Sequence, residues 1–463
     1  MRTALAVGAA RAAGALSRLR GGGATSLPGV VGLKIQPRLI GRLRRNLGGS
    51  IVVTGTNGKT TTSRFIGEIL RAAGKPYIHN QSGSNLLRGI AATLAQGAAR
   101  ARGGRGTGRG GQKPWGLFEV DEATMPAACA ELAPKIVVVT NLFRDQLDRY
   151  GELQRTADYL RQAFAALPKS TTILLNADDP LVASLGKGLP QQIVYFGLED
   201  TSVSKPGLPH AADSITTPTG QLLRYEAVFT GHLGHYRSPD RSLKRPKPNV
   251  AVTDIQLDGI AGSDVAIKLG RKTIKLRLGV PGVYNVYNAV AAAAVGHAIG
   301  VAPAKIGKAI ARTAAAFGRA ESAAVDGRTV FIGLIKNPTG ANEVIHTVAL
   351  DGKSKDFLIV INDNFADGTD VSWLWDADFE QLLPGARTVA VAGTRADDMA
   401  LRLKYAGRRE QDVAVYHSIE KALGESLAKL PKDGTLYVLP TYTAMLELRR
   451  ELANAGHLKH YLH

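Results

Sequence analysis

The chain of 463 residues contains one cysteine, Cys129, and no uncharged apolar run long enough to cross a bilayer. A single cysteine excludes an internal disulfide and any zinc site built from cysteine thiolates. Cys129 stands in an apolar helical context at residues 126–132, so we interpret it as a packing residue and not as a nucleophile. These absences are typical of a globular protein from a reducing compartment, and no segment is expected to span a membrane.

Acidic residues are scarce relative to basic ones, since 39 Asp and Glu stand against 58 Lys and Arg, a formal net charge of +19. Such a charge favours acidic partners (nucleotides, anionic lipid head groups or nucleic acid) without choosing among them. Much of the basic excess lies in residues 38–45, 100–113 and 237–247. The glycine–arginine tract at 100–113 lacks the aromatic residues that stack on bases, so we interpret it as a solvated loop insertion. No nucleic-acid partner is expected, and a nucleic-acid-binding protein using this tract is the alternative from another functional class.

The most informative segment is residues 52–62, which read VVTGTNGKTTT: a β-branched strand, a glycine turn and the start of a helix. Glycines let the backbone approach an anion, and free N–H groups at a helix start face phosphates. The pattern predicts an ATP-binding loop in which Lys59 reaches the β- and γ-phosphates and the Thr60 hydroxyl holds Mg²⁺. Val53 stands where a standard Walker A motif has glycine, so the loop departs from generic P-loops. The expected ATP contacts in this loop are Gly55, Thr56, Asn57, Gly58, Lys59, Thr60 and Thr61.

From residue 52 to about 325, short β-branched runs alternate with helical patterns, which predicts an α/β fold with a mostly parallel sheet. The expected strands are 51–53, 115–120, 136–140, 172–176 and 192–196. Ligands of such sheets collect beyond the carboxyl ends of the strands, so we choose Glu119 as the second Mg²⁺ ligand. The polar cluster at 140–151 follows the third of these strands. Two interpretations of it are equal: a part of the site at the strand ends, or helix capping with surface ion pairs.

Several segments together resemble the Mur ligase family: TGTNGKTT at 54–61, TNLFRDQLDRYG at 140–151 and NADDP at 176–180. Gln146 stands where those ligases have the histidine of a second metal site, which puts that site in question. Five further segments are similar to one branch of the family, the MurT subunits of lipid II isoglutaminyl synthases. They are NQSGSN at 80–85, EVDE at 119–122, HLGHY at 232–236, GVYNVYN at 282–288 and DNFADGTDVSWLWD at 363–376.

The resemblance implies ATP-dependent amidation of the α-carboxylate of D-glutamate in the lipid II stem peptide, giving D-isoglutamine. The carboxylate would become an acyl phosphate, and ammonia from a GatD-like glutaminase partner in a heterodimer would attack it. ATP and Mg²⁺ are the implied cofactors. The implied location is cytoplasmic, at the inner face of the plasma membrane, with peripheral contact to the membrane-bound substrate. The alternative is an amino-acid-adding ligase of the Mur or folylpolyglutamate type, against which the tryptophan-rich segment 363–376 argues.

The resemblance also implies roles for individual residues. Asn285 is similar to the family's nucleotide-contacting asparagine, and Asn288 beside it is expected to be a helix cap. Arg319 stands in a segment that resembles the hinge between the central and C-terminal domains of Mur ligases. The resemblance implies that it reaches the nucleotide when the domains close. An equal alternative is that it forms a salt bridge within the linker. Asp370 is expected to orient the histidine of the partner's Cys–His pair, as the third member of a triad does. Asp367 and Asp376 stand behind it for that role.

Many members of the MurT branch carry a four-cysteine zinc ribbon, but the matching positions here are Thr216, Thr219, Ser238 and Arg241. Hydroxyls and an arginine cannot replace thiolates around zinc, so no zinc is expected. Residues 1–20 are predicted to form a surface helix and not a signal peptide, because Arg11 interrupts the apolar stretch.

The predicted domains are an N-terminal extension packing on the ligase domain at 1–48, a Mur ligase central ATP-binding domain at 49–317 and a MurT-type domain at 318–463. The central domain includes a degenerate zinc-ribbon-like insert at 200–248. The last domain is expected to be a smaller Rossmann-like α/β unit with strands at 329–335, 357–361, 388–392 and 436–439.

Overall fold

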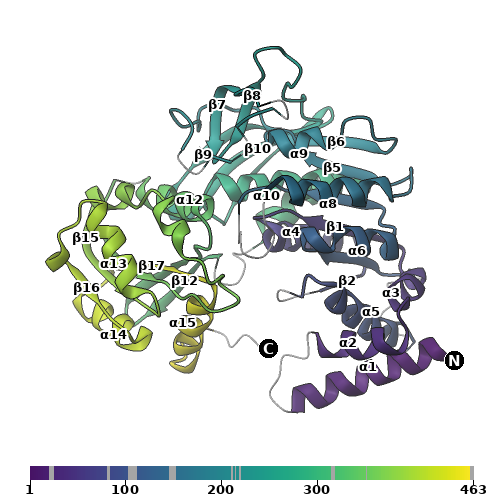
Figure 1. Cartoon of the computed structure of the whole chain (residues 1–463), viewed down its shortest axis with the longest axis horizontal. Coiled ribbons are helices and arrows are strands. Elements are labelled where there is room, and N and C mark those ends of the chain that lie inside the picture. The colour runs from purple at the N-terminus through teal and green to yellow at the C-terminus, as the bar shows by residue number, and fades with distance from the viewer. Residues whose placement is uncertain are drawn as a thin grey trace.

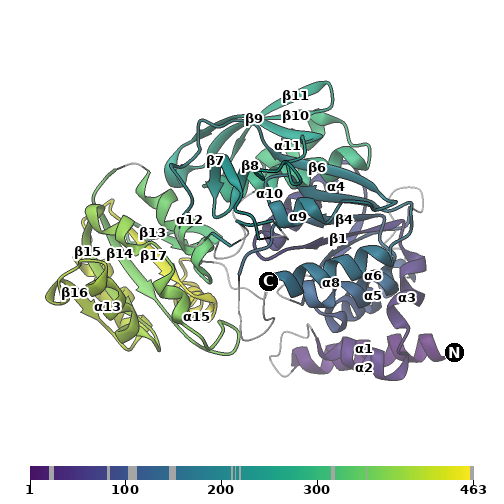
Figure 2. The same ribbon diagram turned by 45° about the horizontal axis from the view of Figure 1, so that its top comes forward.

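The computed structural model describes residues 1–19, 26–80, 84–102, 112–144, 153–209, 212–213, 215–217, 220–313, 319–350 and 352–458. They form two α/β units that lie side by side, with the N-terminal helices at one end of the molecule (Figures 1 and 2). Each unit is built around a mostly parallel sheet, which confirms the predicted fold class.

The central sheet has nine strands. They are β1 (Gly49–Thr54), β2 (Tyr77–His79), β3 (Trp115–Glu119), β4 (Ile136–Val139), β5 (Thr172–Asn176), β6 (Gln192–Leu198), β9 (Val250–Leu257), β10 (Ser263–Leu269) and β11 (Lys272–Leu278). Their order is β11-β10-β9-β6-β5-β4-β1-β3-β2, in which β10 pairs antiparallel with β9 and β11 and every other pairing is parallel. The five strands predicted for this unit are confirmed.

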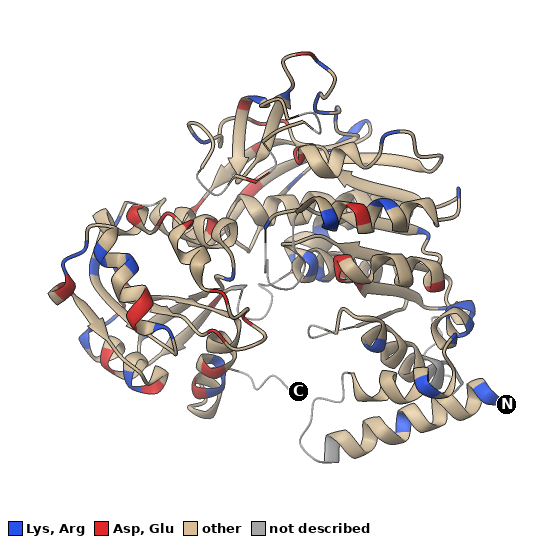
Figure 3. Ribbon diagram, in the orientation of Figure 1, with Lys and Arg blue, Asp and Glu red and all other residues tan. Residues whose placement is uncertain are grey.

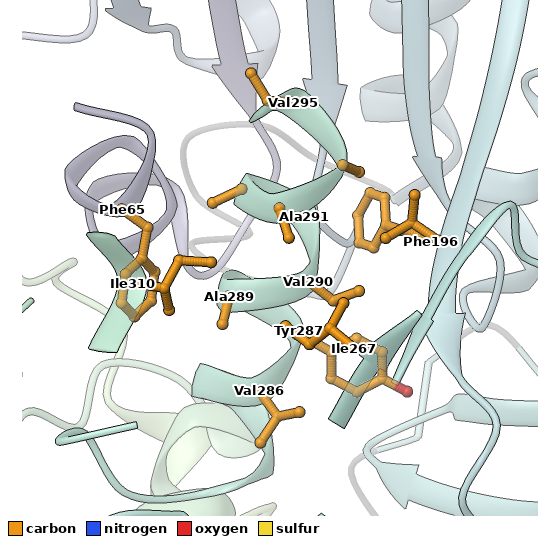
Figure 4. Packing of buried hydrophobic residues seen from close by; sticks show 14 of the residues in the cluster. Phe65, Phe196, Ile267, Val286, Tyr287, Ala289, Val290, Ala291, Val295 and Ile310 are labelled. Atoms are coloured by element: carbon orange, nitrogen blue, oxygen red, sulfur yellow. The ribbon is translucent and has the colours of Figure 1, made fainter. Parts of the chain in front are cut away.

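Helices cover both faces of the central sheet. They are α4 (Lys59–Ala72), α5 (Leu87–Arg102), α6 (Met125–Leu132), α8 (Leu153–Ala165), α9 (Pro180–Ser184), α10 (Val283–Ala298) and α11 (Pro303–Ala311). Strand β1 is buried on both faces: Ile51 and Val53 enter one core, and Val52 enters the other. This is why β1 reads as a continuous β-branched run and not as an alternating one. In the first core, α10 is buried on all sides along residues 285–296 and packs between α4, α11 and the sheet (Figure 4).

The second core holds the single cysteine. Cys129, on α6, is fully buried, and burial raises the pKa of its thiol to about 12. A thiol that stays protonated is a poor nucleophile, so the interpretation of Cys129 as a packing residue is confirmed.

Three N-terminal helices, α1 (Arg2–Leu19), α2 (Leu27–Ile35) and α3 (Leu39–Leu43), precede the central sheet. The predicted surface helix is confirmed as α1, which packs mainly on α2, while α2 packs on α5. The second contact is close, because a Cβ on Gly29 would lie 1.6 Å from the carbonyl oxygen of Arg88. None of the described helices combines the length and the apolar character that crossing a bilayer requires.

The C-terminal sheet has six strands, β12 (Arg319–Val325), β13 (Arg328–Gly333), β14 (Lys355–Val360), β15 (Ala386–Ala392), β16 (Val413–Val415) and β17 (Thr435–Pro440). Their order is β12-β13-β17-β14-β15-β16, with only β12 antiparallel to its neighbour. The flanking helices are α12 (Pro338–Ala349), α13 (Ala396–Tyr405), α14 (Ile419–Lys429) and α15 (Tyr442–Asn454). The four predicted strands of this unit are confirmed.

Between β6 and β9 lies a two-stranded sheet of β7 (Arg224–Thr230) and β8 (Leu233–Arg237). The turn after β8, which has Ser238 and Arg241 at the places of zinc-ribbon cysteines, is held by hydrogen bonds. The Ser238 hydroxyl donates to Asp240 Oδ1 at 2.6 Å and accepts from the Leu243 amide at 3.0 Å. Arg241 occupies this turn at a φ of 61°, and Thr219 lies outside the described residues.

Candidate functional site

The predicted phosphate loop lies between the end of β1 and the start of α4. Gly55 and Gly58 adopt φ values of 124° and 87°, which L-residues with side chains rarely adopt. Space is equally restricted: a Cβ on Gly55 would lie 2.3 Å from Thr140 Oγ1, and one on Gly58 would lie 2.1 Å from Asn288 Oδ1. Both positions therefore require glycine, and the turn directs the first amides of α4 toward the space beyond the sheet.

The segment that follows β4 holds this loop in place. Asn141 Oδ1 accepts from the Asn57 amide at 2.8 Å, and the Thr140 hydroxyl donates to the Asn57 carbonyl at 2.7 Å. The Thr56 hydroxyl accepts from the Phe143 amide at 2.9 Å. In the described part of the cluster, residues 140–143 contact the phosphate loop, while Arg144 forms an ion pair with Asp213, as the alternative of surface ion pairs expected. The rest of the cluster, residues 145–151 with Gln146, lies outside the described residues.

Two predicted Mg²⁺ ligands come together at the edge of the loop, where the Thr60 hydroxyl donates to Glu119 Oε2 at 2.9 Å. Oxygen donors of this kind suit a hard cation that also binds phosphates and water. His79 Nε2 lies 3.3 Å from Glu119 Oε1. Asn80 pairs twice with the Glu119 backbone, through its amide nitrogen and its amide oxygen, both at 2.8 Å. Sequence reasoning did not assign His79 and Asn80 to the site, although His79 ends strand β2 and Asn80 follows it, as Glu119 ends β3.

Lys59 points along the loop. Its Nζ donates to the Gly55 carbonyl at 2.5 Å and lies 3.1 Å from Glu122 Oε1. Glu122 belongs to the carboxylate cluster after β3, and its side chain is mostly buried. The ion pair with Glu122 keeps the Lys59 ammonium group beside the phosphate loop. A polyphosphate bound to the loop would compete with Glu122 for this ammonium group.

The two asparagines of α10 make different contacts. Asn285 is buried; its amide donates to the Pro281 carbonyl at 2.8 Å, and its oxygen accepts from Asn288 at 3.1 Å. Asn288 Oδ1 accepts from the Thr62 hydroxyl at 3.2 Å, against the phosphate loop. The interpretation of Asn288 as a helix cap was wrong, because α10 begins at Val283 and Asn288 lies inside it.

Arg319 is the first residue of β12. Its side chain and residues 314–318 lie outside the described part of the chain, so its predicted contact with the nucleotide stays a prediction.

A cavity of about 310 Å³ lies between the two α/β units, over the phosphate loop. Lys59, Thr60 and Glu119 line it from the central unit, and Lys336, Ala366 and Tyr442 line it from the C-terminal unit. The C-terminal unit also contacts the loop directly. Asn337 is the N-cap of α12, and its side-chain amide nitrogen donates to Asn57 Oδ1 at 3.2 Å. The cavity and its lining are therefore assembled from both units.

The acidic loop at 363–376 follows β14 and contains four aspartates, of which Asp363 lies 2.9 Å from Arg395 Nε. The other three, which the sequence suggested for the partner's triad, differ in exposure. Asp367 is buried and accepts from the Thr443 amide at 2.7 Å, and burial raises the pKa of its carboxyl. Asp370 is exposed; the Ser372 amide donates to it at 2.8 Å, and this hydrogen bond lowers its pKa. Asp376 is half exposed and lies 3.8 Å from Arg144 Nη2. Of the three, Asp370 offers an ionised carboxylate to solvent without an ion-pair partner among the described residues.

A buried polar network behind the site joins the two-stranded insert to α10. Asp178 is fully buried; it lies 2.6 Å from Arg245 Nε and accepts from the Tyr287 hydroxyl at 2.7 Å. Arg245 also lies 2.7 Å from Glu199. Burial raises the pKa of Asp178, and the charge of Arg245 opposes that rise. The NADDP segment therefore fastens the insert to the core.

Arg245→Met is expected to destabilise the protein by about 3–5 kcal/mol at neutral pH, because it leaves the buried Asp178 carboxylate without its cation. The pKa of Asp178 then lies still further above its unfolded value, so the folded state holds the extra proton and stability falls as pH rises. The loss measured by urea unfolding should be larger at pH 8 than at pH 5. Arg237→Met, which removes an exposed pair with Glu226, is the control and should change stability by less than about 1 kcal/mol. An equal loss at both pH values would contradict the role of Asp178.

Comparisons with known proteins find matches in both α/β units. Residues 53–217 match the Mur ligase middle domain, and residues 334–445 match the MurT ligase C-terminal domain. The chain is 33% identical to the lipid II isoglutaminyl synthase (glutamine-hydrolyzing) subunit MurT of Streptococcus pneumoniae over 95% of this chain and 94% of that protein.

Solved structures of low sequence identity share the fold. A pseudomurein peptide ligase type C from Methanothermus fervidus superposes with a TM-score of 0.65 at 22% identity, covering 88% of this chain and 79% of that chain. MurF ligase from Thermotoga maritima in complex with ADP superposes with a TM-score of 0.60 at 13% identity, covering 92% and 85%.

Proposed function

Because this chain belongs to the MurT proteins of the Mur ligase family, we propose that it is the ATP-using subunit of a lipid II isoglutaminyl synthase. It would convert the α-carboxylate of D-glutamate in the stem peptide to the amide of D-isoglutamine. The observation that carries this proposal is the cavity between the units, which has the phosphate loop on one side and Ala366, from the acidic loop, on the other. One cavity therefore connects a site for ATP with the loop that distinguishes this branch.

The proposed chemistry proceeds in two steps. A carboxylate oxygen of D-glutamate attacks the γ-phosphorus of ATP, forming an acyl phosphate and releasing ADP. The lone pair of ammonia then attacks the acyl carbon, the C–O bond to phosphate breaks, and inorganic phosphate and one proton leave. The protein must neutralise charge on the transferring phosphoryl group, which is the proposed role of Lys59 and the first amides of α4.

Mg²⁺ is the metal proposed for this reaction, with Thr60 and Glu119 as its protein ligands. Their oxygens lie 2.9 Å apart, which suits two neighbouring ligands of one cation. When bound, the ion would neutralise phosphate charge. His79, 3.3 Å from Glu119, and Asn80, paired with its backbone, would keep the carboxylate oriented.

The remaining ATP contacts are proposed as predicted from the sequence. They are Gly55, Thr56, Asn57, Gly58, Thr61, Asn285 and Arg319. Asn288 is added to them, because it lines the cavity beside Gly58 whereas Asn285 lies behind it.

Ammonia is proposed to come from a separate glutaminase subunit of the GatD type in a heterodimer. Free ammonia is scarce and mostly protonated at neutral pH, and Cys129, the only cysteine of the chain, is buried. We propose that Asp370 orients the histidine of the partner's Cys–His pair. Its exposure supports this choice over the buried Asp367 and the Arg144-facing Asp376.

Three further assignments belong to the proposal. The domains are 1–48, 49–317 and 318–463, a division that the two separate sheets support. The insert at 200–248 keeps its shape without zinc through hydrogen bonds such as Ser238 to Asp240, and stoichiometric zinc in the purified protein would contradict this. The enzyme acts in the cytoplasm at the inner face of the plasma membrane, where lipid II is made accessible to it.

The test is to purify this chain with a candidate glutaminase and supply lipid II, ATP, Mg²⁺ and glutamine labelled with ¹⁵N in its side-chain amide. Mass spectrometry should show one labelled nitrogen in the stem peptide, and only when both subunits and ATP are present. Addition of a whole amino acid, without need of a partner, would instead favour the amino-acid-adding ligase.

A further inference from the structure

The N-terminal helices carry basic residues and no acidic ones. Residues 1–48 contain nine Lys and Arg and no Asp or Glu, and the first acidic residue of the chain is Glu68. In Figure 3, α1 accordingly carries Lys and Arg colouring and no acidic colouring along the outer edge of the molecule. The α/β units, by contrast, carry acidic as well as basic residues in this figure.

Helix α1 is apolar on its inner and its outer face. Ala6 and Ala10, on the inner face, are fully buried against neighbouring helices. Leu5 and Leu16 are 65% and 51% exposed on the outer face. At about 100° per residue, the eleven positions between these leucines return them to within about 20° of each other around the helix. The outer leucines therefore form one stripe, which nothing in the described chain covers.

Exposed arginines flank this stripe on both sides. Around the helix, Arg2 lies about 60° from Leu5 in one direction and Arg11 about 120° in the other. Lys34, Arg38, Arg42 and Arg45 add four more exposed cations on α2, on α3 and next to them. None of these six basic side chains forms an ion pair with an acidic group among the residues that the structure describes.

We propose that α1 and the basic residues around it form a docking surface for an anionic lipid bilayer. A helix with an apolar stripe between cations lies in the plane of the interface, with the leucines among the acyl chains and the arginines at the phosphates. This arrangement uses both faces of α1, one for the protein core and one for the lipid.

Nucleic acid fits this surface less well than lipid. The chain contains no Phe, Tyr or Trp before Phe65, so α1 to α3 offer no ring on which a base could stack. Exposed leucines gain nothing from a phosphate backbone, whereas they lose contact with water in a bilayer. Lipid binding is thus the interaction that uses the charge and the stripe together.

The docking surface goes beyond the proposed function and does not rest on it, since lipid binding requires no turnover. The test is cosedimentation of the full-length protein with vesicles of equal parts phosphatidylglycerol and phosphatidylcholine, compared with phosphatidylcholine alone. Binding is expected to the anionic vesicles and to decrease with added salt. Arg2→Gln with Arg11→Gln should weaken it by about fivefold for each arginine removed at low salt. Leu5→Gln with Leu16→Gln should weaken it by about tenfold or more.

Two matched variants control for charge and for apolar area elsewhere. Lys429→Gln with Lys432→Gln removes two exposed cations from the C-terminal unit, and Leu208→Gln with Leu222→Gln removes two exposed leucines from the insert. Both should bind vesicles like the unmodified protein, and all variants should keep its unfolding temperature. The proposal fails if the unmodified protein ignores anionic vesicles, if the α1 variants bind as well as the controls, or if Arg2 and Arg11 serve only RNA binding.

Discussion

Asp370→Asn is expected to lower glutamine-driven amidation by about 10⁴-fold while leaving amidation driven by added ammonium salt nearly unchanged. The carboxylate is exposed, and its hydrogen bond from the Ser372 amide keeps it ionised by lowering its pKa. Asparagine has the same shape and still accepts that hydrogen bond, so the loop should keep its conformation. It cannot, however, stabilise an imidazolium in the partner subunit. The measurement is amidation of lipid II by the two-subunit enzyme with glutamine or with ammonium as nitrogen source.

Asp397→Asn is the matched control, because Asp397 is an exposed aspartate at the start of the nearby helix α13. It changes the net charge by the same amount as Asp370→Asn. Amidation with glutamine and amidation with ammonium should both keep the rate of the unmodified enzyme. Unchanged glutamine use by the Asp370 variant would move the role to Asp376 or Asp367. Equal loss with both nitrogen sources would assign Asp370 to the ATP site instead.

Lys59→Met is expected to lower kcat for ammonium-driven amidation by about 10²–10³-fold, the usual cost of removing one donor aimed at transition-state charge. Methionine keeps an unbranched stem of similar length without the charge. Nucleotide affinity should fall less than kcat, because the amides at the start of α4 still bind the phosphates. The measurements are lipid II-dependent release of ADP and, separately, binding of a non-hydrolysable ATP analogue.

Lys187→Met is the control within the same unit, since Lys187 is an exposed lysine away from the cavity. It should retain the activity of the unmodified enzyme. A Lys59 variant that keeps its activity to within a few-fold would show that charge on the phosphoryl group is neutralised elsewhere, with Lys336 on the opposite cavity wall as the next candidate.

The parts of the fold that the sequence predicted are those that local patterns encode. β-branched runs predicted the strands of both sheets, and the glycines of the phosphate loop predicted its place between β1 and α4. Glu119 could be chosen as a candidate Mg²⁺ ligand because parallel strands bring their carboxyl ends to one edge. Its hydrogen bond with Thr60 agrees with that choice.

The errors and omissions concern side chains whose roles depend on distant segments. Asn285 and Asn288 are three residues apart on one helix, and only the packing of α10 against α4 decides which of them faces the phosphate loop. His79 reaches Glu119 because β2 pairs with β3, across 40 residues of chain. Neither fact leaves a local trace in the sequence.

By itself, the sequence determined the α/β fold, the phosphate loop and the resemblance to one ligase branch, because these depend on residue order and spacing. Only the tertiary structure decided that Asp178 and Arg245 form a buried pair, that Asp370 is exposed while Asp367 is buried, and that a leucine stripe on α1 stays uncovered. Burial and exposure arise from contacts between segments far apart in the chain. They set the pKa values, the available charges and the free surfaces on which the proposed chemistry and lipid docking depend.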